Sequence, residues 1–423
     1  MAGAALTDRI AASLGPLPPA ALGIAVSGGG DSMALLHLLH DMADTRGLSL
    51  RAVTVDHGLR AGSAEEAAGV AACCAALGIP HDTLQWADWD GSGNLQAAAR
   101  DARYRLMADW AARHDIGAIA LGHTADDQAE TFVMRLARRS GVDGLSAMAP
   151  HSVRAGIEWL RPLLGIHRAE LRGYLRERGI DWVDDPGNED PAFDRIRIRK
   201  ALDTLAELGI GRDVLGEVAG HMRKARQALG WQTYLAAREL VHLDAGSVVI
   251  CERRLRTQPD EIQRRLMVAA LGWVGGADYP PRRASVARVL AAVSQGRPCT
   301  VDGCQIRVIG GQIWVFREFA AVESQRGTPN GLWDSRWRLH ASGGGGMGPL
   351  RVAALGPEGV AAVPRMAQIR PTEGGFAVLP GRVAGRGSGG RALREPPRTV
   401  ARGNRRRRRC LFCRTIIALN LPA

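Results

Sequence analysis

The sequence predicts an α/β protein with a doubly wound parallel sheet, followed by a smaller, mainly helical domain and an irregular C-terminal region. Short apolar runs alternate with helical stretches over residues 22–122, the pattern changes after Pro162, and Gly-rich and Arg-rich stretches dominate beyond residue 340. Strands that alternate with helices form parallel sheets, whose ligands bind at the carboxyl ends of the strands. We place the domains at residues 1–212, 213–325 and 326–423, since 423 residues suffice for two or three cores.

The first domain is expected to contain four strand–helix repeats. The strands are residues 22–26, 50–55, 79–86 and 118–121, and the helices are residues 31–42, 64–77, 95–114 and 124–139. Ser63, Asn94 and Thr124 have side chains that cap helices, and each stands at a predicted helix start.

The pattern after Pro162 is different. We expect a helix over residues 166–178, an acidic loop over 181–194 and one long amphipathic helix over 214–240. Residues 241–320 mix short strands with helices at 261–273 and 284–294, and they end in a hairpin at 304–318.

The net charge of +12 suggests a nucleic-acid partner, because clustered arginines neutralise phosphates. Most of that charge lies in one segment. Residues 382–414 hold twelve Arg and one acid, Glu395, so the rest of the chain carries a net charge of +1. The body of the protein is therefore nearly neutral.

Composition points to the cytoplasm and away from membranes and secretion. Asp8, Arg9 and three prolines interrupt the apolar residues near the N-terminus, so we expect no signal peptide. No apolar run approaches the ~20 residues that cross a bilayer. The seven Cys are odd in number and sparse, unlike a secreted disulfide framework.

The strongest motif is Ser-Gly-Gly-Gly-Asp-Ser at residues 27–32, directly after a predicted strand and opening a helix. Glycines let the backbone approach phosphate oxygens, and a helix N-terminus supplies free N–H groups. Asp31 suits this place if Mg²⁺ bridges it to phosphate. A purely structural glycine turn is the alternative.

Two other phosphate-binding motifs are excluded. A Walker loop needs Gly-Lys-Ser/Thr, but neither Lys200 nor Lys224 follows a glycine. A Rossmann fingerprint needs a third glycine where Met33 stands. The segment resembles instead the pyrophosphate loop of the N-type ATP pyrophosphatases, the PP-loop superfamily, which hold the departing pyrophosphate while AMP goes to the substrate.

Three further motifs follow. Asp56 and His57 end the second strand, where a nucleotide lies in such sheets, although a buried polar strand end is the plain alternative. Arg100 and Arg103 lie one turn apart, which a solvated helix face also explains.

The third motif is Gly-His-Thr-Ala-Asp-Asp-Gln-Ala-Glu-Thr at residues 122–131, directly after the fourth strand. It puts His123 at a carboxyl end and puts Asp127 and Glu130 on one helical face. Two carboxylates on one face suit a cationic amine, whereas acids in a first turn also act as caps.

In this order and spacing, the motifs resemble the tRNA(Ile)-lysidine synthases over residues 20–320. The resemblance continues through Leu-Ala-Arg-Arg-Ser-Gly at 136–141, Arg-Pro-Leu-Leu at 161–164, Asp-Pro-Gly-Asn at 185–188 and the Arg-rich run 195–199. Pro-Arg at 281–282 and Cys-Thr-Val-Asp-Gly-Cys at 299–304 are similar to their smaller domain. Arg139 and Gly187 depart from the Gly and Ser/Thr usual in that family.

The resemblance implies a reaction. The C2 oxygen of the wobble cytidine in a CAU anticodon of isoleucine tRNA attacks the α-phosphate of ATP, and free L-lysine then displaces AMP through its ε-amine. The implied catalytic residues are Asp31, Asp127 and His123. The implied ATP-binding residues are Ser27, Gly28, Gly29, Gly30, Asp31, Ser32, Asp56, His57 and Arg103. Asp127 and Glu130 are implied to bind lysine and Asp31 to bind Mg²⁺, with the general base left open between His123 and a carboxylate. No membrane partner is expected, and a homodimer is allowed.

Two other function classes stay open at this point. A tRNA thiolase shares the adenylation step but needs catalytic Cys or an iron–sulfur cluster. Cys73 and Cys74 lie in an Ala-rich helix, and Cys410 and Cys413 form a single Cys-x-x-Cys without a second pair. A non-catalytic RNA-binding protein would explain the basic tail but not the phosphate loop.

Residues 374–414 lack an apolar period and include five consecutive arginines, so we expect disorder and sequence-independent attraction to RNA. Truncation after Pro371 should give RNA binding a shallower dependence on salt, because fewer phosphates are neutralised, while lysine transfer at low salt survives. Filter binding across a salt series measures the slope. A folded truncation that cannot modify tRNA at saturating RNA would contradict this expectation.

Overall fold

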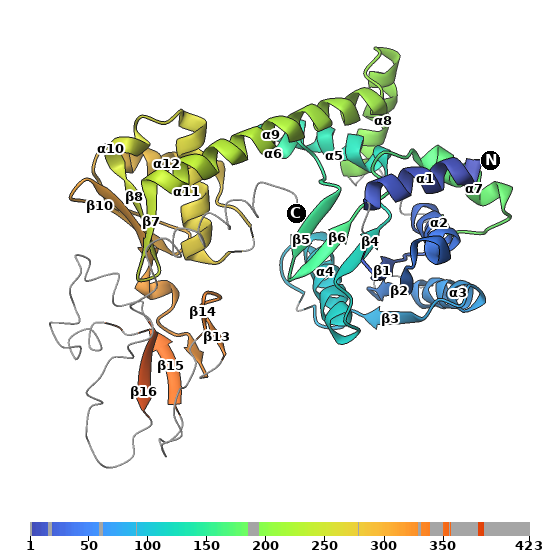
Figure 1. Cartoon of the computed structure of the whole chain (residues 1–423), viewed down its shortest axis with the longest axis horizontal. Coiled ribbons are helices and arrows are strands. Elements are labelled where there is room, and N and C mark those ends of the chain that lie inside the picture. The colour runs from blue at the N-terminus through green and yellow to red at the C-terminus, as the bar shows by residue number, and fades with distance from the viewer. Residues whose placement is uncertain are drawn as a thin grey trace. The chain divides into compact units, whose positions relative to one another are not determined.

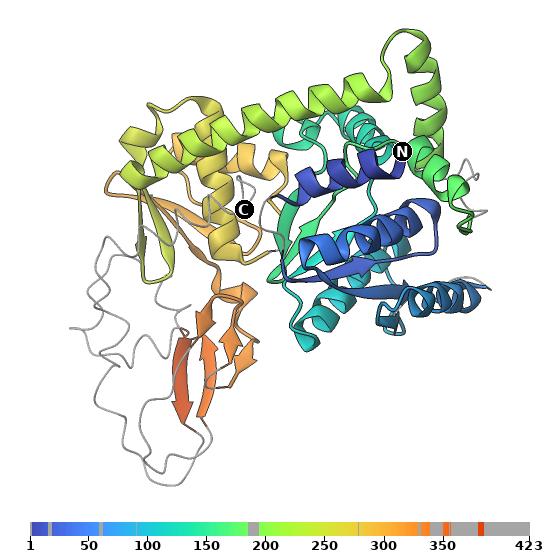
Figure 2. The ribbon, with the colours of Figure 1, turned by 45° about the vertical axis from the view of Figure 1, so that its right-hand side comes forward.

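The computed structural model describes residues 2–15, 19–58, 62–89, 91–184, 194–277, 279–328, 331–338, 350–354, 356 and 380–384. The chain divides into two compact units, residues 1–226 and 227–421, and this boundary falls within one continuous helix, α9 (Arg212–Leu240) (Figures 1 and 2). In the part of the chain that is described, no helix has the length and apolar character to cross a membrane.

The first unit is built on a six-stranded sheet with the order β3-β2-β1-β4-β6-β5. Its strands are β1 (Ala21–Ala25), β2 (Ser49–Asp56), β3 (His81–Gln85), β4 (Ala118–Leu121), β5 (His151–Arg154) and β6 (Ile157–Leu160). All neighbours are parallel except β5, which pairs antiparallel with β6. The predicted doubly wound α/β fold is confirmed.

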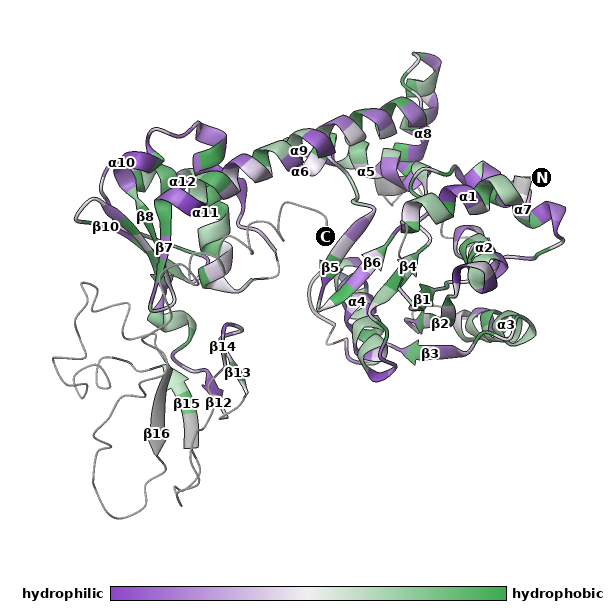
Figure 3. Cartoon of the chain, viewed as in Figure 1, coloured by the Kyte–Doolittle hydropathy of each residue, from purple (hydrophilic) through white to green (hydrophobic). Residues whose placement is uncertain are grey.

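Helices lie on both faces of this sheet and beside it. They are α1 (Ala2–Leu14), α2 (Gly30–Arg46), α3 (Ser63–Ala76), α4 (Leu95–Arg113), α5 (Ala125–Ala137), α6 (Val142–Leu145), α7 (Arg168–Glu177) and α8 (Asp194–Glu207). One apolar core joins α1, α2, α3 and α7 to one face, and a second joins α4 to the other. The residues of β4 alternate between the two cores, and all are apolar (Figure 3).

Predicted helix starts agree with the structure to within a residue or two. Asn94 accepts a hydrogen bond from the N–H of Ala97 at 3.0 Å and caps α4. Thr124 caps α5 through a reciprocal capping box with Asp127. The predicted cap Ser63 is instead the first residue of α3, and Gly62 occupies the cap position.

Several elements were not predicted. The sequence analysis did not identify α1, α8 or the β5–β6 hairpin. After α5, Arg139 has a φ of 55°, the left-handed conformation that glycine adopts without strain. This explains physically why a glycine is the usual residue there and makes Arg139 a locally strained substitution.

The second unit centres on a five-stranded antiparallel sheet with the order β7-β8-β11-β10-β9. Its strands are β7 (Val241–Asp244), β8 (Ser247–Cys251), β9 (Cys299–Val301), β10 (Cys304–Ile309) and β11 (Gln312–Arg317). α10 (Glu252–Leu255), α11 (Asp260–Gly275) and α12 (Arg283–Ser294) accompany it, and an apolar core joins the sheet to α11 and α12.

Short strands follow this sheet: β12 (Arg326–Gly327), β13 (Leu332–Trp333), β14 (Trp337–Arg338), β15 (Leu350–Ala354) and β16 (Pro380–Ala384). Buried Asp334, between β13 and β14, binds Arg317 of β11 at 3.1 Å and Arg336 at 2.7 Å. Within the segment 374–414, β16 pairs with β15, and the other residues of that segment lie outside the described part.

Gly122, directly after β4, approaches the start of α2 closely. A Cβ atom there would lie 3.1 Å from both the Cα and the N of Ser32, which are backbone atoms that cannot rotate away. Only glycine therefore lets the end of β4 approach the N-terminus of α2 this closely.

We expect Gly122→Ala to lower the free energy of unfolding of the first unit by about 1–3 kcal/mol, because the backbone must shift to admit the methyl group. Gly117→Ala, just before β4, is the matched control, since a Cβ there meets nothing within 4 Å. Urea unfolding followed by circular dichroism compares them. Equal unfolding midpoints for the two variants would show that the close approach carries no constraint.

Candidate active site

The loop at residues 27–32 connects β1 to α2 at the carboxyl edge of the sheet. Gly28 has a φ of 83°, and the Ser32 hydroxyl donates to the carbonyl of Gly29 at 2.9 Å and accepts from the N–H of Ser27 at 3.1 Å. No side chain caps α2 at Gly29. The loop thus closes on itself and leaves the first N–H groups of the helix for an anion.

The loop lies at the point where the strand order reverses. β1 lies between β2 and β4 in the sheet. From β1 the chain continues to β2 and β3 at one edge, and from β4 it continues to β5 and β6 at the other edge. Ligands bind at such a point in doubly wound sheets. Gly122 brings the residues after β4 against Ser32, so two strand ends contribute to one site.

Asp127 faces this point from the first turn of α5. Its Oδ2 accepts from the N–H of Thr124 at 2.8 Å and from the Thr124 hydroxyl at 3.0 Å. Burial alone would raise the pKa of Asp127, but Arg168, these Thr124 donors and His123 together lower it. The carboxylate therefore stays ionised. Asp127 also caps α5, and this structural role is compatible with a functional one.

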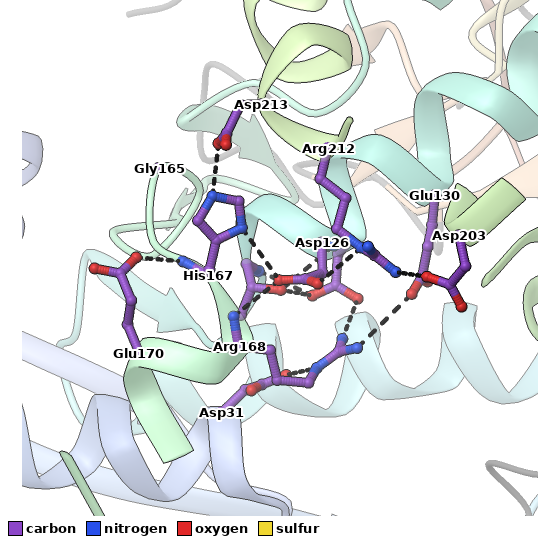
Figure 4. Close-up of polar contacts among 12 residues, drawn as sticks. Asp31, Asp126, Glu130, Gly165, His167, Arg168, Glu170, Asp203, Arg212 and Asp213 are labelled. Carbon is purple, nitrogen blue, oxygen red and sulfur yellow. Dashed lines mark hydrogen bonds and ion pairs between the residues drawn. The ribbon is translucent and has the colours of Figure 1, made fainter. Parts of the chain in front are cut away.

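Arg168, the first residue of α7, joins Asp31, Asp127 and Glu130, which we call the carboxylate cluster (Figure 4). Its Nε lies 2.9 Å from Asp31 Oδ2, its Nη2 3.2 Å from Asp127 Oδ1 and its Nη1 3.8 Å from Glu130 Oε1. One guanidinium thus contacts the phosphate-loop acid and two of the acids of α5, Asp127 and Glu130.

Burial raises the pKa of Asp31, and the nearby Arg168 offsets this only in part. Asp31 Oδ1 is buried without a hydrogen-bond partner. A lone carboxylate oxygen fits Mg²⁺ held mainly by substrate phosphates, which needs only one or two protein carboxylates. Among the residues described, no group of three or more His, Cys, Asp or Glu forms a dedicated metal site.

Glu130 is the most buried member of the carboxylate cluster, at 2% exposure. Its Oε1 accepts from Nε of Arg199 on α8 at 2.6 Å, and its Oε2 is buried without a hydrogen-bond partner. A buried carboxylate oxygen of this kind calls for a further donor.

A second set of ion pairs surrounds Asp126. It accepts from the backbone N–H of Arg168 at 2.8 Å and lies 3.2 Å from Nε of Arg212. His167 lies 3.7 Å from Asp126 and 2.6 Å from Asp213 (Figure 4). These contacts fix the start of α7, and with it the position of Arg168.

His123 is a neutral imidazole. Burial is the main cause that lowers its pKa well below its usual range, and the positive charges of Arg161, Arg103 and Arg100 add to the effect, while Asp127 opposes it. Its Nδ1 is buried without a hydrogen-bond partner. The side chain can accept a hydrogen bond at neutral pH but holds no charge.

Asp56 and His57 lie at the end of β2, as predicted. Asp56 accepts from the N–H of Gly58 at 2.9 Å and from Gln85 at 3.0 Å, and these donors help to lower its pKa. The His57 ring meets Trp86 edge-on at 5.6 Å between centroids. Burial and Arg103 lower the pKa of His57. Leu59 and Arg60 of the same motif fall among the residues left undescribed.

Arg103 interacts electrostatically with both His57 and His123, so its charge lies within range of the ends of β2 and β4.

Trp182 and Val183 lie against the loop at residues 27–32. The N–H of Val183 donates to the carbonyl of Gly28 at 3.0 Å, and Trp182 lies 3.3 Å from a Cβ built at Gly30. The Asp-Pro-Gly-Asn motif at 185–188 follows but is not described.

The sequence analysis missed the central residue, Arg168. Its position in the sequence could have indicated its role. A cation at the first residue of a helix opposes the helix dipole, so nearby acids are needed to hold it there. Arg199 belonged to a quoted motif, but its pairing with Glu130 was not foreseen.

Comparisons with known proteins agree with this geometry. Residues 4–205 match the PP-loop domain family. A tRNA(Ile)-lysidine synthase from Ruegeria pomeroyi is 51% identical over 79% of this chain and 80% of its own. Those from Mesorhizobium japonicum and Wolbachia pipientis wMel are 39% and 36% identical, over 78% and 71% of this chain and 74% and 71% of theirs.

Among solved structures, the U34-tRNA thiolase NcsA from Methanococcus maripaludis with its 4Fe-4S cluster is 16% identical, with a TM-score of 0.46, over 52% of this chain and 78% of its own. That likeness carries no argument here.

The loop, the sheet and the matched domain define an ATP-dependent ligase of the PP-loop class. More narrowly, the chain belongs to the tRNA(Ile)-lysidine synthases, whose substrates are isoleucine tRNA and lysine. The family membership decides against the thiolase and the non-catalytic alternatives. Consistently, burial raises the pKa of the Cys74 thiol to about 12, so this thiol is not poised to react.

Proposed function

We propose that this synthase adenylates the C2 oxygen of the wobble cytidine in the CAU anticodon and then joins lysine to C2 through its ε-amine. Pyrophosphate and AMP are the products. The observation that carries the proposal is the single guanidinium of Arg168, which contacts Asp31 beside the phosphate loop and Asp127 and Glu130 on α5. The acids suited to each half-reaction therefore belong to one site.

The first half-reaction uses the loop at residues 27–32. Its N–H groups and the Ser27 and Ser32 hydroxyls bind the β- and γ-phosphates that leave as pyrophosphate. Asp31 would hold Mg²⁺, which neutralises charge developing on the leaving group. Asp56, His57 and Arg103 bind the rest of ATP, a role supported by their place at or near the neighbouring strand ends.

The second half-reaction uses the carboxylate cluster. Asp127 and Glu130 bind the amino groups of lysine, because paired carboxylates hold an ammonium by charge-assisted hydrogen bonds. The ε-amine must lose a proton to attack C2. The receiving group stays open between His123, which is neutral but a weak base because burial lowers its pKa, and a carboxylate such as Glu130, whose Oε2 lacks a hydrogen-bond partner.

We further propose that residues 1–212 catalyse the reaction and residues 213–325 bind tRNA, with residues 326–423 forming a separate C-terminal region. Residues 241–317 build a separate sheet–helix core, which supports a distinct role for that part of the chain. A cytoplasmic location follows from a tRNA substrate. The homodimer stays a proposal that light scattering can test.

We expect Asp31→Ala to abolish tRNA-dependent AMP formation while tRNA binding persists, because the mutation removes the proposed Mg²⁺ ligand from the phosphate site. Release of pyrophosphate from ATP in the presence of isoleucine tRNA measures the step. Asp44→Ala, an exposed acid on the same helix, is the control and should retain activity. Pyrophosphate release by Asp31→Ala at the rate of that control would remove Asp31 from the mechanism.

We expect Glu130→Gln to raise the lysine concentration needed for half-maximal transfer by tens-fold, through loss of a contact worth ~1.5–3 kcal/mol. Adenylation should change far less. Incorporation of labelled lysine and AMP formation separate the two half-reactions. Glu207→Gln, an exposed acid at the end of α8, is the control. Equal damage to both half-reactions would assign Glu130 to packing or to ATP.

A further inference from the structure

The acids proposed to bind lysine already hold a cation of the protein itself. Nε, Nη2 and Nη1 of Arg168 each face a different member of the carboxylate cluster. Of the six carboxylate oxygens in the cluster, only Asp31 Oδ1 and Glu130 Oε2 are buried without a hydrogen-bond partner. An ammonium that binds Asp127 Oδ1 and Glu130 together would compete with this guanidinium, while Arg199 stays on Glu130 Oε1 at 2.6 Å.

Arg168 is held where neither its helix nor its burial favours it. As the first residue of α7, it brings positive charge to the positive end of the helix dipole. Burial lowers its pKa, but Asp31, Asp127 and Glu130 more than reverse that effect. Without Arg168, the three acids would be like charges removed from water, with Arg199 still paired to Glu130. The contacts of Arg168 therefore compensate for much of the negative charge of the carboxylate cluster.

The bound nucleotide offers Arg168 another partner. Asp31 stands in the first turn of α2, next to the loop that receives the phosphates, and the guanidinium contacts Asp31 directly. A guanidinium matches the geometry of phosphate as well as that of carboxylate. Triphosphate at the loop would therefore compete with Asp127 and Glu130 for Arg168 over a short movement of its side chain.

We propose that Arg168 is a positioning residue that makes lysine binding depend on nucleotide. Without ATP it occupies the carboxylate cluster, and with ATP it shifts to the phosphates and exposes Asp127 and Glu130 to the incoming amine. This inference rests on the proposed lysine site. It orders the reaction, because the nucleophile is admitted when the nucleotide that activates the cytidine is present. By linkage, lysine tightens nucleotide binding by the same factor.

Equilibrium dialysis of labelled L-lysine against the full chain tests the proposal, with α,β-methylene ATP and Mg²⁺ as the unreactive nucleotide. For the unchanged protein, we expect lysine affinity to rise at least tenfold when the nucleotide is present. Arg168→Gln should bind lysine without nucleotide as tightly as the unchanged protein does with it, and adding nucleotide should then have little effect.

Arg172→Gln is the matched control, because Arg172 lies one turn further along α7 and pairs with Asp184 outside the cluster. It should keep the full dependence on nucleotide. Thermal unfolding gives a second readout. Arg168→Gln should melt at a lower temperature than the control, and lysine alone should raise its midpoint more than it raises that of the unchanged protein.

Two results would overturn the gating role. One is equal lysine affinity of the unchanged protein with and without nucleotide. The other is a folded Arg168→Gln that shows no gain in lysine affinity without nucleotide. If Arg168→Gln does not fold, Arg168→Lys replaces it, because one ammonium reaches fewer of the three carboxylates and should weaken the dependence on nucleotide. An unchanged dependence in that variant also overturns the role.

Adding Glu130→Gln to Arg168→Gln separates this inference from the proposed lysine site. Loss of the gained lysine affinity in the double variant supports both. A gain that survives Glu130→Gln means that lysine binds elsewhere, and the site assignment fails with it. If Glu130→Gln alone raises the lysine requirement but Arg168→Gln shows no gain, the site stands and only the gate fails.

Discussion

The parallel pairing of β1 with β4 is the constraint on which the rest of the site depends. Leu22 to Ala25 are in register with Ala118 to Leu121, so the two strands end together. The chain then turns into α2 after one strand and into α5 after the other. Gly122 completes this arrangement, because a side chain there would meet the backbone of Ser32. Two helix N-termini thereby converge on the same small volume.

Helix N-termini attract negative charge, and here the protein has placed acids of its own beside them. Asp31 stands in the first turn of α2, and Asp126 and Asp127 stand in the first turn of α5. Arg168 and Arg212 are brought to these acids, and Arg199 to Glu130 of α5, from outside both helices. The outcome is a site of mixed sign, in which an anionic nucleotide and a cationic amino acid can each find partners.

Much of this arrangement was predictable, because local signals specify local structure. Asn94 and Thr124 cap helices whose starts could be predicted directly, and the glycine-rich loop after a strand indicated the candidate phosphate site. The motif at residues 122–131 likewise predicted Asp127 and Glu130 on one face of α5. The ion-pair partner of these acids, Arg168, could not be predicted. Arg168 is separated from Asp31 and Asp127 by 137 and 41 residues in sequence, and only the fold brings it to them. The roles assigned to these residues remain proposals.

His123 illustrates a consequence of burying an imidazole among arginines. Histidine is the side chain whose charge normally changes within the physiological pH range. Here burial and three neighbouring arginines hold the ring in its uncharged form well into acid. A cell that becomes mildly acidic would alter many exposed histidines without altering this one. The charge of His123 is in this respect insulated from the proton concentration of its surroundings.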